Sequence, residues 1–458
     1  MTLVAFLILL TAVIIGYVLN LRAARALRDG GARMHSLDGF HGGYAALMVL
    51  VPTFFLIIFW LLFESYIIEF LIMAAIPAEE LLDKGVGEIQ LIMAEIRSIA
   101  DGRVFGTPED WKLNAAERLE TLRDMSGLFL VALTAALAAL MLYVARRRVA
   151  ADFRARQGLE RIVHRIMVSC AVVAIFVTIG IVASLSFETF RFFQMVPFWD
   201  FVLGTTWEPQ IPIREDQIAA EGAFGMLPVF LGTLVIATVA MVIATPIGLF
   251  SAIYLHEFAN SRVRAVVKPV LEILAGVPTV VYGFFAILVI APALRNFGAE
   301  LGIPIASNTA LAAGGVMGIM LIPFISSFAD DALGAVPRSL RDGSLAVGAT
   351  SAETVSKVLF PAAIPGIVGG ILLAVSRAIG ETMIVVMAAG LIARMTINPL
   401  DSVTTVTVQI VTMLIGDTAF DNPKTLSAFA LGMVLFLMTL MINIAALRIV
   451  RKYREIYD

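Results

Sequence analysis

Long apolar runs separated by short charged segments dominate the chain. Nine of these runs are long enough for a helix of about 20 residues to cross a hydrocarbon core of about 30 Å. They cover residues 3–21, 44–73, 127–145, 163–187, 224–255, 266–294, 309–329, 362–390 and 427–448. The pattern therefore predicts an all-α polytopic membrane protein with about nine transmembrane helices.

The composition agrees with a membrane protein and excludes several other classes. Hydrophobic residues make up 60% of the 458 residues and charged residues only 15%, whereas soluble domains carry about a quarter charged residues. The net charge of −3 gives no indication of a nucleic-acid partner. The four histidines and the single cysteine lack the spacing of metal ligands, so we expect no metal site.

The charges between the runs predict the orientation. The basic segments 22–42, 146–165 and 256–265 and the C-terminal tail fall on one side of the membrane if nine runs cross it. Basic segments favour the cytoplasmic side. We therefore expect an external N-terminus, a cytoplasmic C-terminus, and a cytoplasmic position for the loop 330–361.

The segment 146–165, which contains seven arginines, is the natural boundary within the chain. It separates a three-helix N-terminal membrane extension, 1–157, from a six-helix core, 158–458. Within the extension, the stretch 78–125 has apolar residues at helical spacing, and Thr107-Pro108-Glu109 is typical of a capped helix start. This stretch predicts a small external helical segment, whose role the sequence does not reveal.

The loop RDGSLAVGATSAETVSKVLFP, Arg341 to Pro361, lies between two apolar runs and is too polar to cross a membrane. Its apolar positions have helical spacing, which is typical of an amphipathic loop at a membrane surface. Gly348 permits a sharp bend between two short helices. Pro361 suits the first turn of the helix that follows, where its missing N–H costs little.

The run after this loop carries two charges, Arg377 and Glu381, which a single helix would place on one face at i and i+4. Charges within a membrane are costly and usually face a protein interior or a wet pathway. The guanidinium of Arg377 offers forked donors to the oxygens of an anion such as phosphate, and Glu381 would either hold it in place or shape the field around the anion. A purely structural ion pair is the alternative.

Glycine and proline mark two further features. Gly276-Val277-Pro278-Thr279 interrupts an apolar run, so its N–H groups and the Thr279 hydroxyl could bind an anion; an ordinary helix start near a proline is the alternative. The pairs Gly314/Gly318 and Gly366/Gly370 have the spacing that favours close helix packing.

The chain has no catalytic signature. It contains no G-x-x-x-x-G-K-[ST] phosphate-binding loop, no G-x-S-x-G and no H-E-x-x-H motif. We therefore expect this chain to have no ATPase site, no catalytic residues and no cofactor of its own. Any ATP would be bound by partner subunits.

The polar loop resembles the "EAA" coupling loop of ABC importer permeases, whose pattern is E-A-A, three residues, Gly, nine residues and I-x-L-P. The matching positions are Asp342, Gly343, Ser344, Gly348, Val358, Phe360 and Pro361. The acid is kept as Asp, but the two alanines are replaced. In that family the loop forms a short coupling helix seated in a groove of the ATPase.

Three further blocks resemble permeases of Pst-type phosphate importers, in the same order along the chain. They are Phe224–Ala259, Leu271–Leu294 and Ser376–Gly390. The resemblance covers about 160–458, and Met383 after Gly380-Glu381-Thr382 favours the C-type subunit. It implies a type I importer permease core in a bacterial inner membrane, and a pathway role for Arg377 and Glu381. Thr279 joins them as a candidate pathway residue because its hydroxyl could bind an anion.

The resemblance also implies partners: a second, A-type permease subunit, two ATP-binding cassette subunits and an external phosphate-binding protein. Transport would proceed by alternating access driven by the ATPases. Two alternatives stay open from the residues: a permease for another oxyanion such as phosphonate or molybdate, and a membrane subunit that signals phosphate status. An ion channel is disfavoured by the spacing of the coupling loop.

Overall fold

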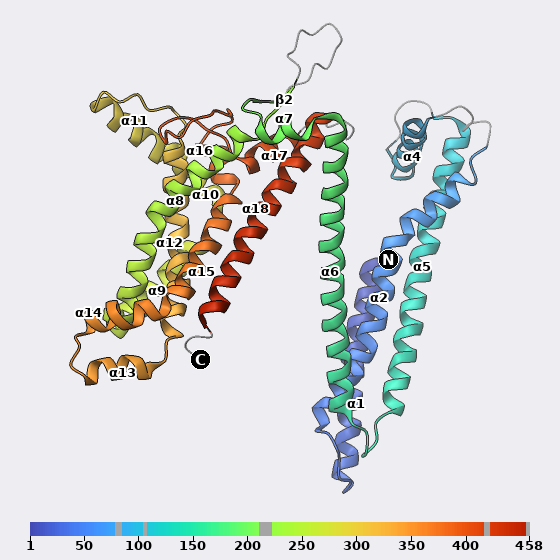
Figure 1. Ribbon diagram of the computed structural model, residues 1–458. Coiled ribbons are helices and arrows are strands. Elements are labelled where there is room, and N and C mark those ends of the chain that lie inside the picture. The colour runs from blue at the N-terminus through green and yellow to red at the C-terminus, as the bar shows by residue number, and fades with distance from the viewer. Residues whose placement is uncertain (78–84, 104–107, 210–221, 416–421, 455–458) are drawn as a thin grey trace. The chain divides into compact units, whose positions relative to one another are not determined.

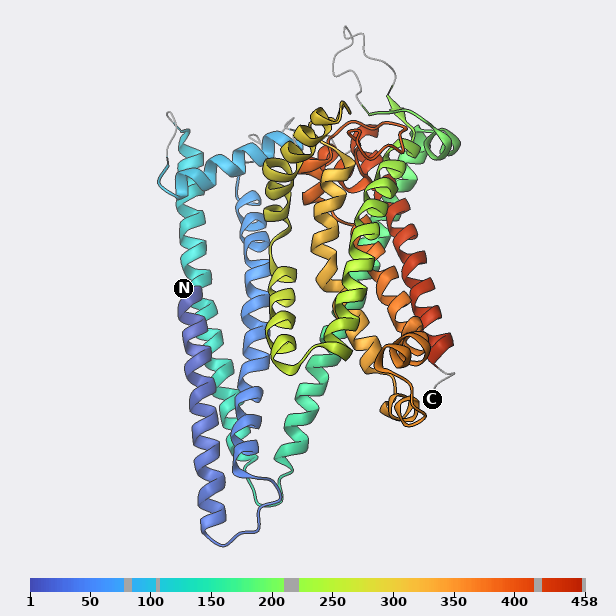
Figure 2. The same ribbon diagram turned by 90° about the vertical axis from the view of Figure 1, so that its left-hand side faces the viewer.

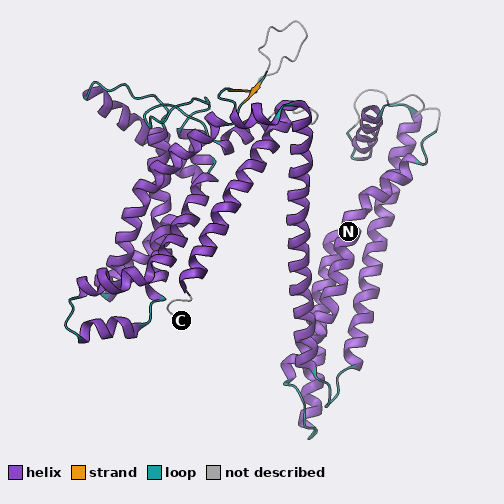
Figure 3. Cartoon of the chain, viewed as in Figure 1, coloured by secondary structure: helices purple, strands orange, loops and turns teal. Residues whose placement is uncertain are grey.

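The computed structural model describes residues 1–458 except 78–84, 104–107, 210–221, 416–421 and 455–458. The described residues are mostly helical, with one antiparallel pair of two-residue strands, β1 (Trp207–Glu208) and β2 (Ala223–Phe224) (Figure 3). The contacts divide the chain into two compact units, Met1–Phe176 (unit 1) and Val177–Asp458 (unit 2). Each unit has its own packed helices.

Within the described residues, nine helical segments are long and apolar enough to cross a membrane, as the sequence predicts. They are Thr2–Asp29, Asp38–Met73, Asp110–Arg147, Ala155–Met195, Leu227–Phe258, Thr279–Glu300, Ala310–Gly334, Ser351–Ile379 and Pro423–Lys452. The predicted all-α polytopic fold is confirmed.

Two predicted spans have the wrong limits. The run 266–294 is divided, because α9 (Ser261–Gly276) ends at Gly276 and a new helix begins at Thr279. The run 362–390 ends early, because α15 stops at Ile379. In both places apolar residues continue beyond the helix end, so hydrophobicity alone does not reveal the break.

Unit 1 is built from α1 (Thr2–Asp29), α2 (Asp38–Met73) and α5 (Asp110–Arg147), which lie side by side in both views (Figures 1 and 2). Small and aliphatic side chains fill the space between these helices. Among the buried ones are Ala5, Leu9, Ile57 and Leu130.

A short helix, α4 (Val86–Ala100), packs on one end of α2 and α5. The cluster between them contains Ile72, Ile96 and Leu119. The sequence predicted helical structure over 78–125, and the described part consists of α4 and the first turns of α5. The expected capped start lies partly outside the described residues, since Thr107 is not described; Glu109 precedes α5 without a side-chain capping bond.

Helix α6 (Ala155–Met195) continues from unit 1 into unit 2. The contact-based division at Phe176 falls inside this helix, whereas the sequence places the domain boundary at 157/158. That boundary stays a prediction.

Unit 2 contains the remaining elements. Their bounds are α7 (Phe198–Leu203), α8 (Leu227–Ile253), η1 (Tyr254–Phe258, π-helical), α9 (Ser261–Gly276), α10 (Thr279–Phe285), η2 (Ala286–Ile290, π-helical), α11 (Ala291–Glu300), α12 (Ala310–Gly334), α13 (Arg338–Ala346), α14 (Ser351–Thr354), η3 (Val355–Leu359, π-helical), α15 (Phe360–Ile379), α16 (Met383–Ala388), α17 (Val406–Leu414) and α18 (Pro423–Arg454). Within this unit, α13 and α14 lie at one end and α7, α16 and α17 lie at the other (Figure 1).

The centre of unit 2 is the packing of α12 against α8 and α15, and glycines make it close. A Cβ on Gly314 would lie 2.9 Å from the Ile236 carbonyl oxygen of α8, and one on Gly370 would lie 2.6 Å from the Phe328 Cβ of α12. The sequence-based prediction that these glycine pairs allow close helix packing is confirmed.

At the end of unit 2 opposite α13, aromatic rings form a second buried cluster. Phe192, Phe201, Trp207 and Phe224 bring α6, α7 and the two strands together, with Phe192 and Phe201 fully buried. Phe192 meets Phe201 and Phe224 edge-on, with ring centroids 5.3 and 5.7 Å apart. This geometry favours aromatic pairs, and it fixes α6 to the core of unit 2.

Candidate functional site

Helix α15 carries Arg377 in its last turn. Pro361 stands in its first turn, and the helix ends at Ile379 with Gly380 as the C-terminal cap. A cation near a helix C-terminus interacts favourably with the helix dipole. The local sequence thus gives Arg377 a favourable place at the end of a membrane helix.

The Arg377 side chain is exposed within the chain and reaches toward α12. Its guanidinium carbon lies 5.4 Å from the centroid of the Phe324 ring, a cation–π contact. Among the described residues, no carboxylate forms an ion pair with Arg377. Its forked donors therefore remain available for an anion.

Glu381 lies beyond the end of α15, so the predicted i, i+4 pair with Arg377 on one helix face is wrong. The Glu381 carboxylate accepts a bond from the Met383 N–H (3.1 Å) at the start of α16. Its backbone carbonyl accepts a bond from the Thr407 hydroxyl (2.9 Å) of α17. Gly380, a weak helix former, permits the turn, and these bonds satisfy backbone groups that a continuing helix would have used.

Thr279 is the first residue of α10, and Pro278 is its N-cap with extended backbone angles (φ −57°, ψ 136°). The geometry is therefore the ordinary helix start near a proline that the sequence left as the alternative. The Tyr282 hydroxyl donates to the Leu274 carbonyl (2.8 Å) and joins α10 to α9 across the break. Within the described residues, no hydrogen bond connects Thr279 to Arg377 or Glu381.

A buried amide on α17 was not found from the sequence. Gln409 of α17 accepts a bond from the Trp207 indole N–H (2.9 Å) and donates to the Leu391 carbonyl (3.0 Å) and the Thr404 hydroxyl (3.1 Å). These bonds fix the irregular segment after α16 to α17 and β1. A lone glutamine in an apolar run carries no spacing signal, so only the tertiary structure reveals its role.

The predicted coupling loop forms two short helical pieces separated by a bend. Asp342, Gly343 and Ser344 lie on α13, and Asp342 and Gly343 are exposed. Gly348 has φ +91°, a left-handed conformation that side chains rarely adopt, so the bend predicted at this residue is present. The Ser344 hydroxyl lies 3.0 Å from the Thr354 hydroxyl of α14 across the bend.

The second piece leads into α15 without a gap. Thr350 caps α14 by accepting a bond from the Glu353 N–H (3.3 Å), and the Glu353 carboxylate accepts one from the Thr350 N–H (3.1 Å). Val358 is half-buried in η3, and Pro361 follows in the first turn of α15. The loop is therefore a helical hairpin in direct continuity with the helix that bears Arg377.

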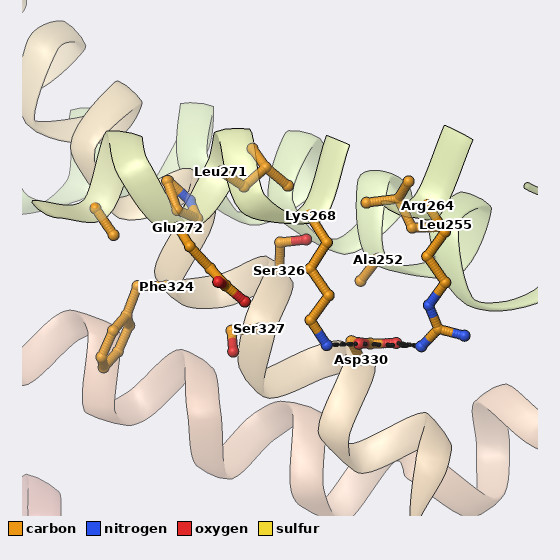
Figure 4. A pocket seen from close by; sticks show the side chains of 12 residues that line it. Ala252, Leu255, Arg264, Lys268, Leu271, Glu272, Phe324, Ser326, Ser327 and Asp330 are labelled. Atoms are coloured by element: carbon orange, nitrogen blue, oxygen red, sulfur yellow. Dashed lines mark hydrogen bonds and ion pairs between the residues drawn. The ribbon is translucent and has the colours of Figure 1, made fainter. Parts of the chain in front are cut away.

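A charged cluster next to this hairpin is the other feature that the sequence did not reveal. Asp330, near the end of α12, is 9% exposed. Its carboxylate accepts bonds from Lys268 Nζ (2.8 Å), Arg264 (3.1 Å) and His256 Nδ1 (2.7 Å). Figure 4 shows Lys268 and Arg264 of α9 converging on Asp330.

The cluster forms one wall of a cavity of about 250 Å³ between α9 and α12. Arg264, Lys268 and Glu272 stand four residues apart on α9, so they line one face of that helix. Phe324 of α12, the same ring that contacts Arg377, also lines the cavity (Figure 4). The signal in the sequence was weak, because the charges come from elements far apart in the chain.

Two family models match the chain in succession. A family described as "Phosphate ATP-binding cassette transporter" matches residues 6–177, and one described as "Binding-protein-dependent transport system inner membrane component" matches residues 244–455. The helical core of unit 2 agrees with the second description. The chain is thus a multi-pass inner-membrane permease of the ABC transporter class.

Individual relatives show to which family of ABC transporter permeases the chain belongs. The chain is 30% identical over 289 residues to a probable ABC transporter permease protein, YqgH, of Bacillus subtilis, covering 62% of this chain and 89% of that protein. It is 32% identical over 237 residues to the phosphate transport system permease protein PstC of Mesorhizobium japonicum, covering 48% of this chain and 71% of that protein. The chain belongs to the PstC family of phosphate transport system permeases, as its motifs indicated.

Solved structures also resemble the chain in part. One is a chain of the MetNI methionine ABC transporter in an inward-facing conformation. The match has a TM-score of 0.37 and 22% sequence identity, and it covers 50% of this chain and 94% of the MetNI chain.

Proposed function

We propose that this chain forms part of the phosphate pathway of an ATP-driven importer and couples that pathway to cytoplasmic ATPase subunits. Its relatives are named as phosphate transport system permeases. The observation that carries the proposal is Arg377, an exposed guanidinium at a helix end, which contacts Phe324 without a carboxylate partner among the described residues. A permanently charged, forked donor suits the oxygens of phosphate.

Glu381 and Thr279 have different roles in this proposal. Glu381 shapes the turn between α15 and α16 and contributes negative charge beside the pathway, which favours release of phosphate. Thr279 offers a hydroxyl at the start of α10. Neither holds Arg377 directly.

The working complex would contain this chain, an A-type permease, two ATP-binding cassette subunits and an external phosphate-binding protein. ATP would bind only to the cassette subunits, and this chain would need no cofactor of its own. Asp342, Gly343 and Ser344 on α13 would seat in the ATPase, while Gly348, Val358 and Pro361 shape the rest of the coupling loop. The C-terminus and this loop would be cytoplasmic and the N-terminus external.

Uptake of labelled phosphate tests the proposal, in cells that lack this chain and every other phosphate importer. Wild type should restore uptake, whereas Arg377→Ala should reduce it by about 10- to 100-fold, the value of one or two charge-assisted hydrogen bonds. Arg295→Ala, at an exposed arginine of α11, serves as the control and should retain uptake. Membrane levels of all three proteins must be equal.

The same assay separates the alternatives. If molybdate or a phosphonate competes with labelled phosphate more strongly than phosphate itself does, the substrate is another oxyanion. If uptake is normal without this chain but the response to phosphate starvation is lost, the chain is a signalling subunit. Normal uptake by Arg377→Ala would remove Arg377 from the pathway.

A further inference from the structure

The coupling helix α13 is joined to the rest of unit 2 by few polar side-chain contacts. None of its nine residues is buried. Besides the Ser344–Thr354 contact to α14, its described side chains make one ion pair with another element, between Arg341 and Glu257 of η1. This pair therefore connects α13 to the α8–η1 helix.

The Arg341–Glu257 pair has an unusual distribution of burial. Arg341 NH2 lies 3.0 Å from Glu257 Oε2, and the side chain of Glu257 is only 4% exposed, whereas that of Arg341 is 46% exposed. A buried carboxylate is stable only with compensating charge. Glu257 therefore holds Arg341 firmly, although α13 itself projects from the core.

His256 connects this pair to the Asp330 cluster. Its Nδ1 lies 2.7 Å from Asp330, and its Nε2 lies 3.7 Å from Glu257 Oε1. Lys268 and Arg264 of α9 complete the compensation of Asp330. Asp330, Glu257 and the four basic side chains around them thus join η1, α9, α12 and α13 in one continuous network.

Helix α12 connects the network to the Arg377 contact. Asp330 and Phe324 are six residues apart on that helix, which is about 9 Å of axial rise. The Phe324 ring meets the Phe328 ring edge-on (ring centroids 4.7 Å apart) and also contacts the Arg377 guanidinium. A movement of Asp330 along the axis of α12 would therefore change the distance between Phe324 and Arg377.

We propose that Arg341 and Glu257 are positioning residues that transmit movement of the coupling helix α13 to α9 and α12, and so to the arginine of the pathway. This inference rests on the proposed function of α13 as the ATPase contact. Loss of the pair would leave α13 seated on the ATPase but loosely connected to the membrane helices. ATP would then be hydrolysed with less phosphate moved.

Exchange of the two charges provides the test. The complete complex, with its ATPase subunits, partner permease and phosphate-binding protein, is reconstituted in liposomes, and the ratio of inorganic phosphate transported to ATP hydrolysed is measured. Arg341→Glu and Glu257→Arg alone should each lower the ratio at least tenfold. The double exchange should restore it to within about threefold of wild type.

The control is Arg262→Glu, which reverses an exposed arginine on α9, two residues from Arg264, with no ion pair among the described residues. It should keep the wild-type ratio. Arg341→Ala supplies a milder variant should charge reversal prevent assembly, and it should lower the ratio without abolishing ATP hydrolysis. Assembly is checked by co-purification of the subunits.

Three results would overturn the inference: a double exchange no better than the single ones, an effect of Arg262→Glu equal to that of Arg341→Glu, or an unchanged ratio in Arg341→Ala. Failure of the proposed function is distinguishable, because the wild-type complex itself would then move no phosphate. A merely structural role would lower hydrolysis and transport together and leave their ratio unchanged.

Discussion

The close approach of α12 to α8 can be tested with two adjacent glycines. Gly314 faces α8, and a Cβ at this position would lie 2.8 Å from Val239 Cβ and 2.9 Å from the Ile236 carbonyl oxygen. At Gly315 the nearest atom to such a Cβ would be the end of the Ile243 side chain, 3.9 Å away. Alanine therefore fits at Gly315 but not at Gly314.

The expected magnitudes follow from two opposing terms. Alanine stabilises a helix by about 1 kcal/mol relative to glycine, and this term is the same at both positions. At Gly314 the contacting atoms are the Val239 Cβ and the Ile236 carbonyl oxygen, which cannot move without the backbone of α8. The helices must therefore separate, and overpacking of this kind costs about 1–3 kcal/mol. The free energies of unfolding of the two variants should then differ by about 1–3 kcal/mol, with Gly315→Ala the more stable.

Thermal unfolding of the purified chain in detergent measures this difference. A separation of about 2 °C in Tm is expected for each kcal/mol, because unit 2 has about 280 residues and its unfolding entropy is about 0.6 kcal/mol/K. Gly314→Ser should resemble Gly314→Ala, because its Cβ meets the same atoms. Equal Tm values for the alanine variants, or a higher one for Gly314→Ala, would refute the packing argument.

Two further predictions concern the hairpin and the aromatic cluster. Gly348→Ala places a side chain at φ +91°, which costs about 1–2 kcal/mol, and it should speed hydrogen exchange in α13 and α14. Gly343→Ala, whose added Cβ would meet nothing within 4 Å, should leave the exchange rates unchanged. Equal exchange rates in the two variants would argue against strain at the bend. Phe192→Ala removes a fully buried ring and should lower the free energy of unfolding by about 3–5 kcal/mol. Phe190→Ala, at a ring that is 64% exposed, should change that free energy by less than about 1 kcal/mol. Unfolding by denaturant measures both values.

The spans and the close packing of unit 2 were predictable from the sequence, because both depend on local patterns. Apolar runs of sufficient length must be helical in a membrane, and the Gly314/Gly318 spacing places two small residues on one helix face. The bend at Gly348 was likewise predictable, since glycine is the residue that adopts a left-handed conformation readily.

The geometry of the site was less predictable, because it depends on tertiary contacts. The residues after Gly380 are as apolar as those before it, so the end of α15 and the separation of Glu381 from Arg377 leave no mark in the hydrophobic pattern. The Asp330 cluster combines groups 62 to 74 residues distant in sequence. Of these features, only the glycine at 380 could have served as a signal, as a helix C-cap.

Helix α5 gives unit 1 an unusual mechanical property. Its 38 residues form one helix about 57 Å long, nearly twice the hydrocarbon thickness of about 30 Å. The excess of roughly 25 Å is a helical extension of the transmembrane part, and α4 packs against this extension. A change of about 10° in the tilt of the transmembrane part would move the far end of this extension by about 4 Å. A fluorophore on α4 would therefore report small changes in the tilt of α5 within the bilayer from a point outside it.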